Sequence, residues 1–287
     1  MKHNTTVIRP ALIMIPLALA LLFSACNLPA NNPITAPTAT LPAPSQPTAE
    51  ATIEAVTPPT AAVEPTSVEG SLPSASLDVS GVAQGVASQV VAAVPPGPDT
   101  PWWEIMPEYT LLTLEGYPVA EHLMQPQVFV YPVEELGVSA AAREAAESLQ
   151  ALLQDRQLGD SLPYLPLYNQ VQMMHAQPQY LGFKNGDGVR YLTEYAQGIV
   201  PINNRELLYT YQGLTADGKY YLAVVLPVNL PGLPANPDIT GDLPADFMND
   251  YSQYKADTVA MLDQQPANAF TPDLSRLDMM VQSIEIK

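Results

Sequence analysis

Residues 171–228, VQMMHAQPQYLGFKNGDGVRYLTEYAQGIVPINNRELLYTYQGLTADGKYYLAVVLPV, determine the fold class. The stretch contains four runs rich in β-branched and aromatic residues, the types that strands favour. These runs span 171–183, 189–197, 206–214 and 219–228. Asn185-Gly186-Asp187-Gly188 separates the first two runs and Thr215-Ala216-Asp217-Gly218 the last two, and both turns carry the Asn-Gly or Asp-Gly pair of hairpins. The pattern predicts an antiparallel meander.

Helical patterns lie on both sides of this block. Residues 139–155, SAAAREAAESLQALLQD, place Ala and Leu side chains on one face behind Ser139, which suits an N-cap. A second helix is expected over residues 246–264, because Pro266 ends the pattern. Thr271-Pro272 predicts the start of a third helix, followed by a short strand over 284–287.

Further strands are expected before the first helix. Residues 110–117 and 127–131 are strand-like runs, each stopped by a proline. Residues 77–94 carry valines at helical spacing but also two glycines, which favours a short strand and turn that join the sheet. Strands in a block with helices at its borders predict an α+β fold, an antiparallel sheet flanked by about three helices.

Composition and charge exclude several function classes. The 287 residues include 11 Lys and Arg against 29 Asp and Glu, a formal net charge of −18, which argues against nucleic-acid binding. One cysteine and three histidines exclude a disulfide scaffold, a Cys-based zinc site and an iron–sulfur cluster, and no cofactor is expected. The nucleophile elbow, the phosphate-binding P-loop and the His-Glu-x-x-His motif are absent from the sequence.

The N-terminus has the pattern of an export signal. Lys2, His3 and Arg9 precede an uncharged apolar run over 10–25, which is too short to span a membrane. Leu22-Phe23-Ser24-Ala25-Cys26 resembles the lipobox of bacterial lipoproteins, with Phe23 where that family usually has Leu. The resemblance implies removal of residues 1–25, lipidation of Cys26 and attachment to the cell envelope on the extracytoplasmic side of a membrane. It covers only these first 26 residues.

A spacer is expected between this anchor and the folded domain. Residues 27–73 are mostly Pro, Thr, Ala and Ser, and no Phe, Tyr or Trp occurs before Trp102 beyond the signal. Such a segment buries too little apolar area to offset the entropy of ordering. We therefore expect a disordered tether over residues 26–75 and one globular domain over 76–287, whose boundary falls between 75 and 100.

Aromatic residues form the one enrichment that suggests a ligand face. Alternating tyrosines on the predicted strands, with two tryptophans from the segment before them, could form a row that stacks on sugars or holds an extended peptide. These residues are Trp102, Trp103, Tyr191, Tyr195, Tyr209, Tyr211 and Tyr221. The alternative is that the tyrosines pack the sheet beneath a helix.

Acidic residues provide two weaker candidate sites. Glu194 and Glu206, on neighbouring predicted strands, could form the carboxylate pair of a glycosidase-like hydrolase. A weak calcium candidate comprises Asp238, Asp242, Asp246 and Asp250, although their spacing matches no EF-hand. The alternative is that Asp242 or Asp246 caps the following helix. His122 and His175 lie far apart in sequence, without an evident catalytic partner.

The last residues carry a second resemblance. Leu277-Asp278-Met279-Met280-Val281-Gln282-Ser283-Ile284 is similar to the final helix and strand of PsbP-like proteins, which are α/β/α sandwiches and mostly non-enzymatic accessories of membrane complexes. The resemblance covers fewer than twenty residues and assigns no functional residue. We expect a membrane-anchored lipoprotein with a non-catalytic binding or scaffolding domain for a protein or glycan partner. The alternatives are a hydrolase with paired carboxylates and a solute-binding lipoprotein, for which the domain is small.

Overall fold

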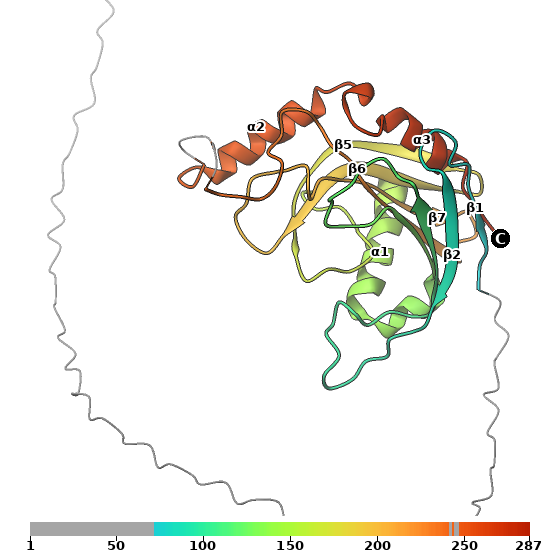
Figure 1. Ribbon diagram of the computed structural model, residues 1–287. Helices are drawn as coiled ribbons and strands as arrows, with labels where there is room; N and C mark the ends of the chain where they lie inside the picture. The colour runs from blue at the N-terminus through green and yellow to red at the C-terminus, as the bar shows by residue number, and fades with distance from the viewer. Residues whose placement is uncertain (1–71, 241–242, 244–246) are drawn as a thin grey trace, which may run out of the picture. The chain divides into compact units, whose positions relative to one another are not determined.

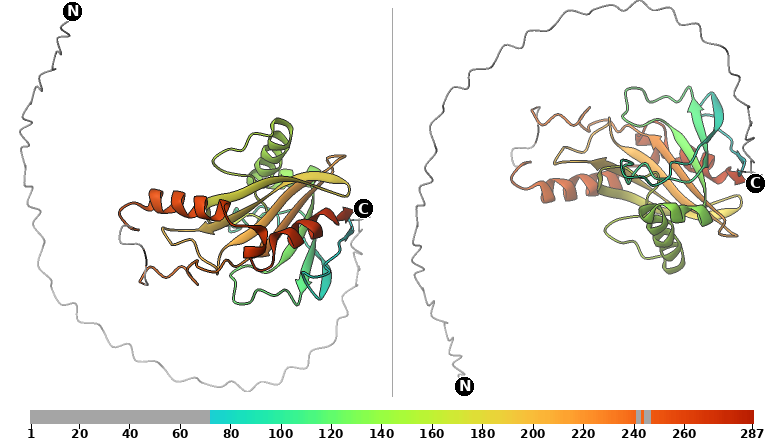
Figure 2. Two further views of the ribbon diagram at one scale, coloured as in Figure 1. Left: turned by 90° about the horizontal axis from the view of Figure 1, so that it is seen from above. Right: turned by 90° about the horizontal axis from the view of Figure 1, so that it is seen from below.

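The computed structural model describes residues 72–240, 243 and 247–287, which form three layers (Figure 1). A seven-stranded antiparallel sheet has the order β2-β3-β4-β8-β7-β6-β5. Helix α1 (Ala140–Asp155) packs on one face of the sheet, and α2 (Tyr251–Asp263) and α3 (Leu274–Gln282) pack on the other (Figure 2). This confirms the predicted α+β class with an antiparallel sheet and three helices. The predicted signal peptide, Cys26 and most of the tether lie outside the described residues.

The predicted meander forms one half of the sheet. Its strands are β5 (Val171–Phe183), β6 (Gly186–Ala196), β7 (Leu208–Thr215) and β8 (Tyr220–Pro227). Each strand pairs with the next along the chain. The β5–β6 turn is tighter than predicted, because Phe183 already pairs with Gly186 and only Lys184 and Asn185 lie between them. Gly218 has φ +71° in the β7–β8 turn, the conformation for which glycine is favoured there.

The other half of the sheet comes from the residues before α1. Its strands are β2 (Gly85–Val91), β3 (Tyr109–Glu115) and β4 (Gln127–Pro132). The two halves join where β4 pairs with β8, in register from Gln127 opposite Val225 to Pro132 opposite Tyr220. A short 3-10 helix, η1 (Val133–Val138), then leads from β4 into α1.

Side-chain caps define where the helices begin. Ser139 caps α1 as predicted, and its hydroxyl accepts a hydrogen bond from Ala142 N. Helix α2 is shorter than predicted, and its N-cap is Asp250, so the expectation that Asp242 or Asp246 caps it was wrong. Helix α3 likewise begins behind Asp273 rather than at Thr271-Pro272. A short 3-10 helix, η2 (Ala267–Ala269), connects α2 to α3.

A buried ion pair ties α3 to the sheet. The Arg190 Nε atom of β6 lies 3.3 Å from Asp278 Oδ1 of α3, and the Tyr209 hydroxyl donates to the same oxygen at 2.9 Å. The Arg190 guanidinium also donates to Gln177 O and Gln179 Oε1, both at 2.8 Å. Burial raises the pKa of Asp278, and the neighbouring Arg190 charge opposes that rise.

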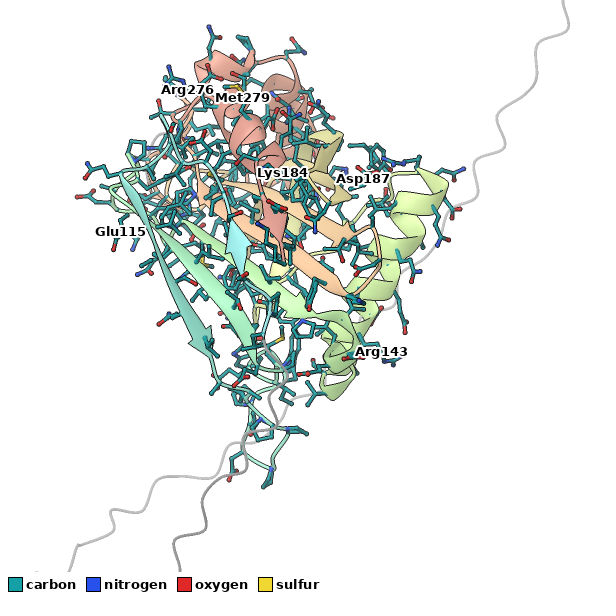
Figure 3. The ribbon with its side chains drawn as sticks, turned by 90° about the vertical axis from the view of Figure 1, so that its right-hand side faces the viewer. Glu115, Arg143, Lys184, Asp187, Arg276 and Met279 are labelled. Carbon is teal, nitrogen blue, oxygen red and sulfur yellow. The ribbon has the colours of Figure 1, made fainter. Side chains whose placement is uncertain are left out.

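The two ends of the described domain meet at its edge. Strand β1 (Ala75–Ser76) pairs with β9 (Glu285–Ile286), and Ser74 and Lys287 exchange backbone hydrogen bonds of 2.8 and 2.9 Å. Figure 3 shows these short strands side by side in front of the main sheet. The folded domain thus includes the chain from at least Ser74 onward. Within the described ranges, no helix combines the length and apolarity needed to cross a membrane.

Candidate functional site

An aromatic groove lies between α1 and the segment over residues 161–170. It encloses about 350 Å³ and is lined on one side by Glu144 and Ser148 of α1. The aromatic residues along it are Trp102, Tyr164, Tyr168 and Tyr195. Trp102 is 49% exposed to solvent, whereas Tyr164 and Tyr195 are buried. Part of the aromatic surface of the groove is therefore free to contact a ligand.

The 161–170 segment is held against the sheet by buried polar side chains. Gln212 of β7 binds both backbone groups of Leu165, accepting from its N at 3.0 Å and donating to its O at 3.1 Å. The Tyr221 hydroxyl donates to the same Gln212 Oε1 at 2.7 Å, and the Tyr191 hydroxyl donates to Pro163 O at 2.7 Å. Because these bonds are buried, they fix the groove floor before any ligand arrives.

The tyrosine rings of the groove form one compact cluster. The ring centroids of Tyr164 and Tyr195 are 4.5 Å apart, and those of Tyr168 lie 5.5 and 5.8 Å from the other two. Gln172 Nε2 donates to the Tyr195 hydroxyl at 3.1 Å. Burial raises the pKa of Tyr168 to about 12, so its hydroxyl remains protonated at physiological pH. The cluster thus offers neutral hydroxyl groups beside apolar ring faces.

The Gln170 side chain carries a buried acceptor atom. Its Oε1 atom is buried and finds no hydrogen-bond partner among the described residues. Gln170 is also part of the groove lining. A buried carbonyl oxygen without a donor costs free energy.

The structure brings some of the predicted ligand-face residues together and separates others. Trp102 and Tyr195 both line the groove, and Trp103 packs edge-on against Trp102 with ring centroids 5.7 Å apart. Tyr191 and Tyr221 lie in the core beneath the groove, on the α1 face of the sheet. These two hold the groove floor instead of contacting solvent.

Three of the five predicted tyrosines, Tyr191, Tyr195 and Tyr221, share one sheet face, but the other two do not. Tyr209 and Tyr211 point to the α2 and α3 face and belong to the other core. The reason is strand register: Tyr191 is opposite Thr210, so the residues on either side of Thr210 project from the opposite face. The Tyr211 hydroxyl donates to Leu181 O at 2.9 Å within that core.

Tyr164, Tyr168 and Gln170 were not predicted as site residues. The two tyrosines lie in a segment rich in Pro and Leu, LPYLPLYN over 162–169, which has no strand or helix periodicity, and Gln170 follows it directly. The available signal was a pair of tyrosines, each one or two residues after a proline, in an otherwise apolar loop. Such a loop exposes apolar surface unless it packs against the domain or holds a ligand.

The two candidate carboxylates lie close together, but Glu194 is closed to solvent whereas Glu206 is partly exposed. Asn203 Nδ2 donates to Glu194 Oε1 at 3.1 Å and to Glu206 Oε2 at 3.0 Å, and Asn203 N donates to Glu194 Oε2 at 2.9 Å. Burial raises the pKa of Glu194 to about 8, and the nearby Glu206 charge adds to that rise. The Glu194 side chain is completely buried, so the pair joins β6 to the following loop.

The contacts and burial of the two histidines indicate structural roles. His122 lies at a polar cleft of about 670 Å³ with Arg205 and Asn204, but its Nε2 atom contacts Leu207 O at 3.0 Å and its Nδ1 accepts from Met124 N at 3.0 Å. Both ring nitrogens are therefore occupied. Burial lowers the pKa of His122 and of His175, which favours the neutral ring in both.

The calcium candidate is only partly described. Asp242 and Asp246 lie outside the described residues. Asp238 Oδ1 accepts from the backbone N and hydroxyl of Thr240, at 2.8 and 2.7 Å, and Asp250 is the α2 cap. Within the part of the chain that the structure describes, no group of three or more His, Cys, Asp or Glu residues is placed to hold a metal ion.

Comparison of the chain with protein-family models, with curated proteins and with solved structures gives no match.

Proposed function

We propose that this chain is a membrane-anchored extracytoplasmic lipoprotein whose folded domain binds a partner through the aromatic groove, without catalysis. The observation that carries the binding role is the pre-formed groove itself. Trp102 offers an exposed ring, and buried side chains fix the segment that carries Tyr164 and Tyr168. Aromatic surface combined with a few directed polar atoms is typical of sites that hold sugars or extended peptides.

The anchor half of the proposal rests on the lipobox-like Leu22–Cys26 sequence. A diacylated N-terminal cysteine attaches a protein stably to a membrane, because two acyl chains bind far more strongly than one. Replacing Cys26 with Ala should move the protein from the membrane fraction to the soluble fraction of its host. Continued membrane association of this variant would contradict the lipid anchor.

The paired-carboxylate hydrolase is the second candidate function. Both Glu194 Oε1 and Glu206 Oε2 lie within hydrogen-bond distance of one nitrogen, so they are at most about 6 Å apart. The raised pKa of Glu194 suits a general acid. Its complete burial leaves no room for a substrate oxygen beside it, which is why we favour binding. Hydrolysis of a glycan or ester that is lost in Glu194→Gln would reverse this preference.

Thermal-shift screening of the chain against cell-wall glycans, peptides and calcium tests the binding half, because a ligand of the folded state raises the unfolding midpoint. A ligand of the groove should raise the midpoint of the wild type but not that of Trp102→Ala or Gln170→Leu. Met279→Ala is the matched control, since Met279 is 60% exposed on α3 (Figure 3). A shift that survives both groove variants would place the ligand elsewhere and contradict the proposal.

A further inference from the structure

We propose that two copies of this chain associate through the open edge of the main sheet. Strand β2 of one copy pairs antiparallel with β2 of the other, about a two-fold axis at Ser88. The pairing joins two seven-stranded sheets into one continuous sheet. This inference goes beyond the proposed function, because it uses neither the aromatic groove nor the lipid anchor.

The main sheet has two edges, and the β5 edge is protected. Pro178 has no N–H group to offer, and the pairing of β5 with β6 shifts register twice. Helix α2 packs on this strand, and Asp263 of α2 accepts a hydrogen bond from the backbone N of Gln177 at 2.6 Å. Prolines, register shifts and covering elements are the usual means of keeping a sheet edge from pairing with another chain.

Strand β2, at the other edge, carries no such protection over residues 85–91. Residues 79–94 contain no proline and no charged side chain, and all seven residues of β2 pair with β3 in unbroken register. Among the residues that the structure describes, no strand pairs with the outer side of β2, and Figure 3 shows it as the outermost strand beside Glu115. Val90 is 58% exposed, and the three residues before it are exposed as well.

Hydrogen bonds alternate along an antiparallel strand, which determines the β2 groups that point outward. Leu114 N of β3 donates to Pro126 O on the β4 side. Glu115 O, in contrast, accepts from Gln84 N on the β2 side. The odd-numbered residues of β3 therefore bond β2, where their partners include Ala87, Gln89 and Val91. The β2 residues whose N–H and C=O groups point to the open edge are Val86, Ser88 and Val90.

These three residues are self-complementary when two copies of β2 run antiparallel about Ser88. Ser88 then lies opposite its own counterpart, and Val86 of each copy lies opposite Val90 of the other. Each of the three opposed pairs exchanges two backbone hydrogen bonds. The β-branched pairs add side-chain packing on one face of the sheet, which a shift of register would lose.

Charge directs a second copy to this edge. Residues 99–287 contain nine Lys and Arg against 24 Asp and Glu, so two domains repel each other over most of their surface. Strand β2 offers an uncharged strip about 23 Å long, on which no like charges come to lie directly opposite each other. The strip is smaller than a standard interface of about 800 Å² per partner, so the dimer is weak. Salt screens the repulsion and should strengthen it.

Sedimentation velocity measures this association between about 1 µM and about 1 mM, the range of weak complexes. Every protein carries Cys26→Ala, so that acyl chains do not contribute. We expect a monomer–dimer equilibrium in this reference chain and association at least about tenfold weaker in Ser88→Lys and in Ser88→Glu, because each places like charges opposite each other. An equal mixture of the two variants should associate at least as strongly as the reference chain. The exposed Ser252 of α2 provides the matched controls Ser252→Lys and Ser252→Glu, which should associate like the reference.

A thiol at residue 88 tests the register. Cys26 is the one cysteine of the sequence, so Ser88→Cys in the Cys26→Ala background has a single thiol. Opposed residues of a hydrogen-bonded pair have Cα atoms about 5.5 Å apart, a separation that a disulfide can bridge. Mild oxidation should therefore give a disulfide-linked dimer. Gln89→Cys, which lies opposite Ala87 of the other copy, should cross-link much less.

Three results would overturn the inference. They are a chain that stays monomeric at about 1 mM, a dimer that Ser88→Lys does not weaken, and a mixture of the two charged variants that fails to associate. Thermal melts of each variant confirm that it is folded. Trp102→Ala should lose a groove ligand but dimerise like the reference chain, so the failure of either proposal is recognised separately.

Discussion

Replacing Glu194 with Gln isolates the effect of one buried carboxyl on stability. Glu194 lies completely buried in β6 and accepts two hydrogen bonds from Asn203. Burial raises its pKa from 4.5 to about 8 in the folded chain. Glutamine has nearly the same shape and cannot ionise, so the variant mimics the protonated form at every pH.

The direction of the effect follows from proton linkage. Between pH 4.5 and pH 8 the folded chain holds a proton on Glu194 that the unfolded chain has lost, so the free energy of unfolding of the wild type falls as pH rises. Each unit of pKa difference corresponds to about 1.4 kcal/mol. The wild type therefore loses about 3 kcal/mol by pH 7 and about 5 kcal/mol above pH 8, relative to pH below 4.5.

Urea unfolding at pH 5, 6, 7, 8 and 9 measures this difference. The wild type and Glu194→Gln should have similar stability near pH 5, and the variant should become the more stable by several kcal/mol at pH 8 and above. Glu147→Gln removes one exposed carboxylate of α1 and controls for the change in net charge. A difference between wild type and Glu194→Gln that is constant with pH, or that grows toward acid, would refute the reasoning.

Two further substitutions test the packing around the sheet. Asp278→Asn leaves the buried Arg190 guanidinium without a counter-charge and should lower the free energy of unfolding by about 3 to 5 kcal/mol. Urea unfolding measures this change, and an effect under about 1 kcal/mol would show that the ion pair is dispensable. Gly188→Ala would place a Cβ atom where Gln212 O and the Tyr211 ring now lie, and should cost about 2 kcal/mol or more. A Cβ atom added at Gly137 would have no other atom within 4 Å, so the control variant Gly137→Ala should keep a stability near that of the wild type. Thermal melts of both glycine variants measure the difference.

Local signals in the sequence predicted the secondary structure well where two of them coincide. Helix α1 was predicted to within one residue, because the Ser139 cap and the spacing of Ala and Leu mark the same start. The start of α2 was missed by about five residues, because several aspartates precede it and each could serve as a cap. The joining of β4 to β8 had no local signal, since 87 residues separate the strand ends that pair and only tertiary packing selects this order.

The site was less predictable than the fold. Alternation along a strand correctly groups Tyr191 with Tyr195, but it cannot say that Tyr209 faces the other way, because the register between strands decides that. The groove also depends on a loop that is ordered by Gln212, a polar residue inside the sheet. No spacing rule indicates that a strand glutamine will bind the backbone of a segment 47 residues earlier.

The β1–β9 pairing determines how the domain carries mechanical load. A pull transmitted from the residues before Leu72 enters the domain through β1, whose partner β9 is held at its opposite end by α3. Force along the strand therefore acts on the Ser74–Lys287 and neighbouring backbone bonds in shear, so that they resist together rather than breaking one after another. Removal of residues 285–287 should leave the main sheet folded at rest but lower the force at which the first strand detaches.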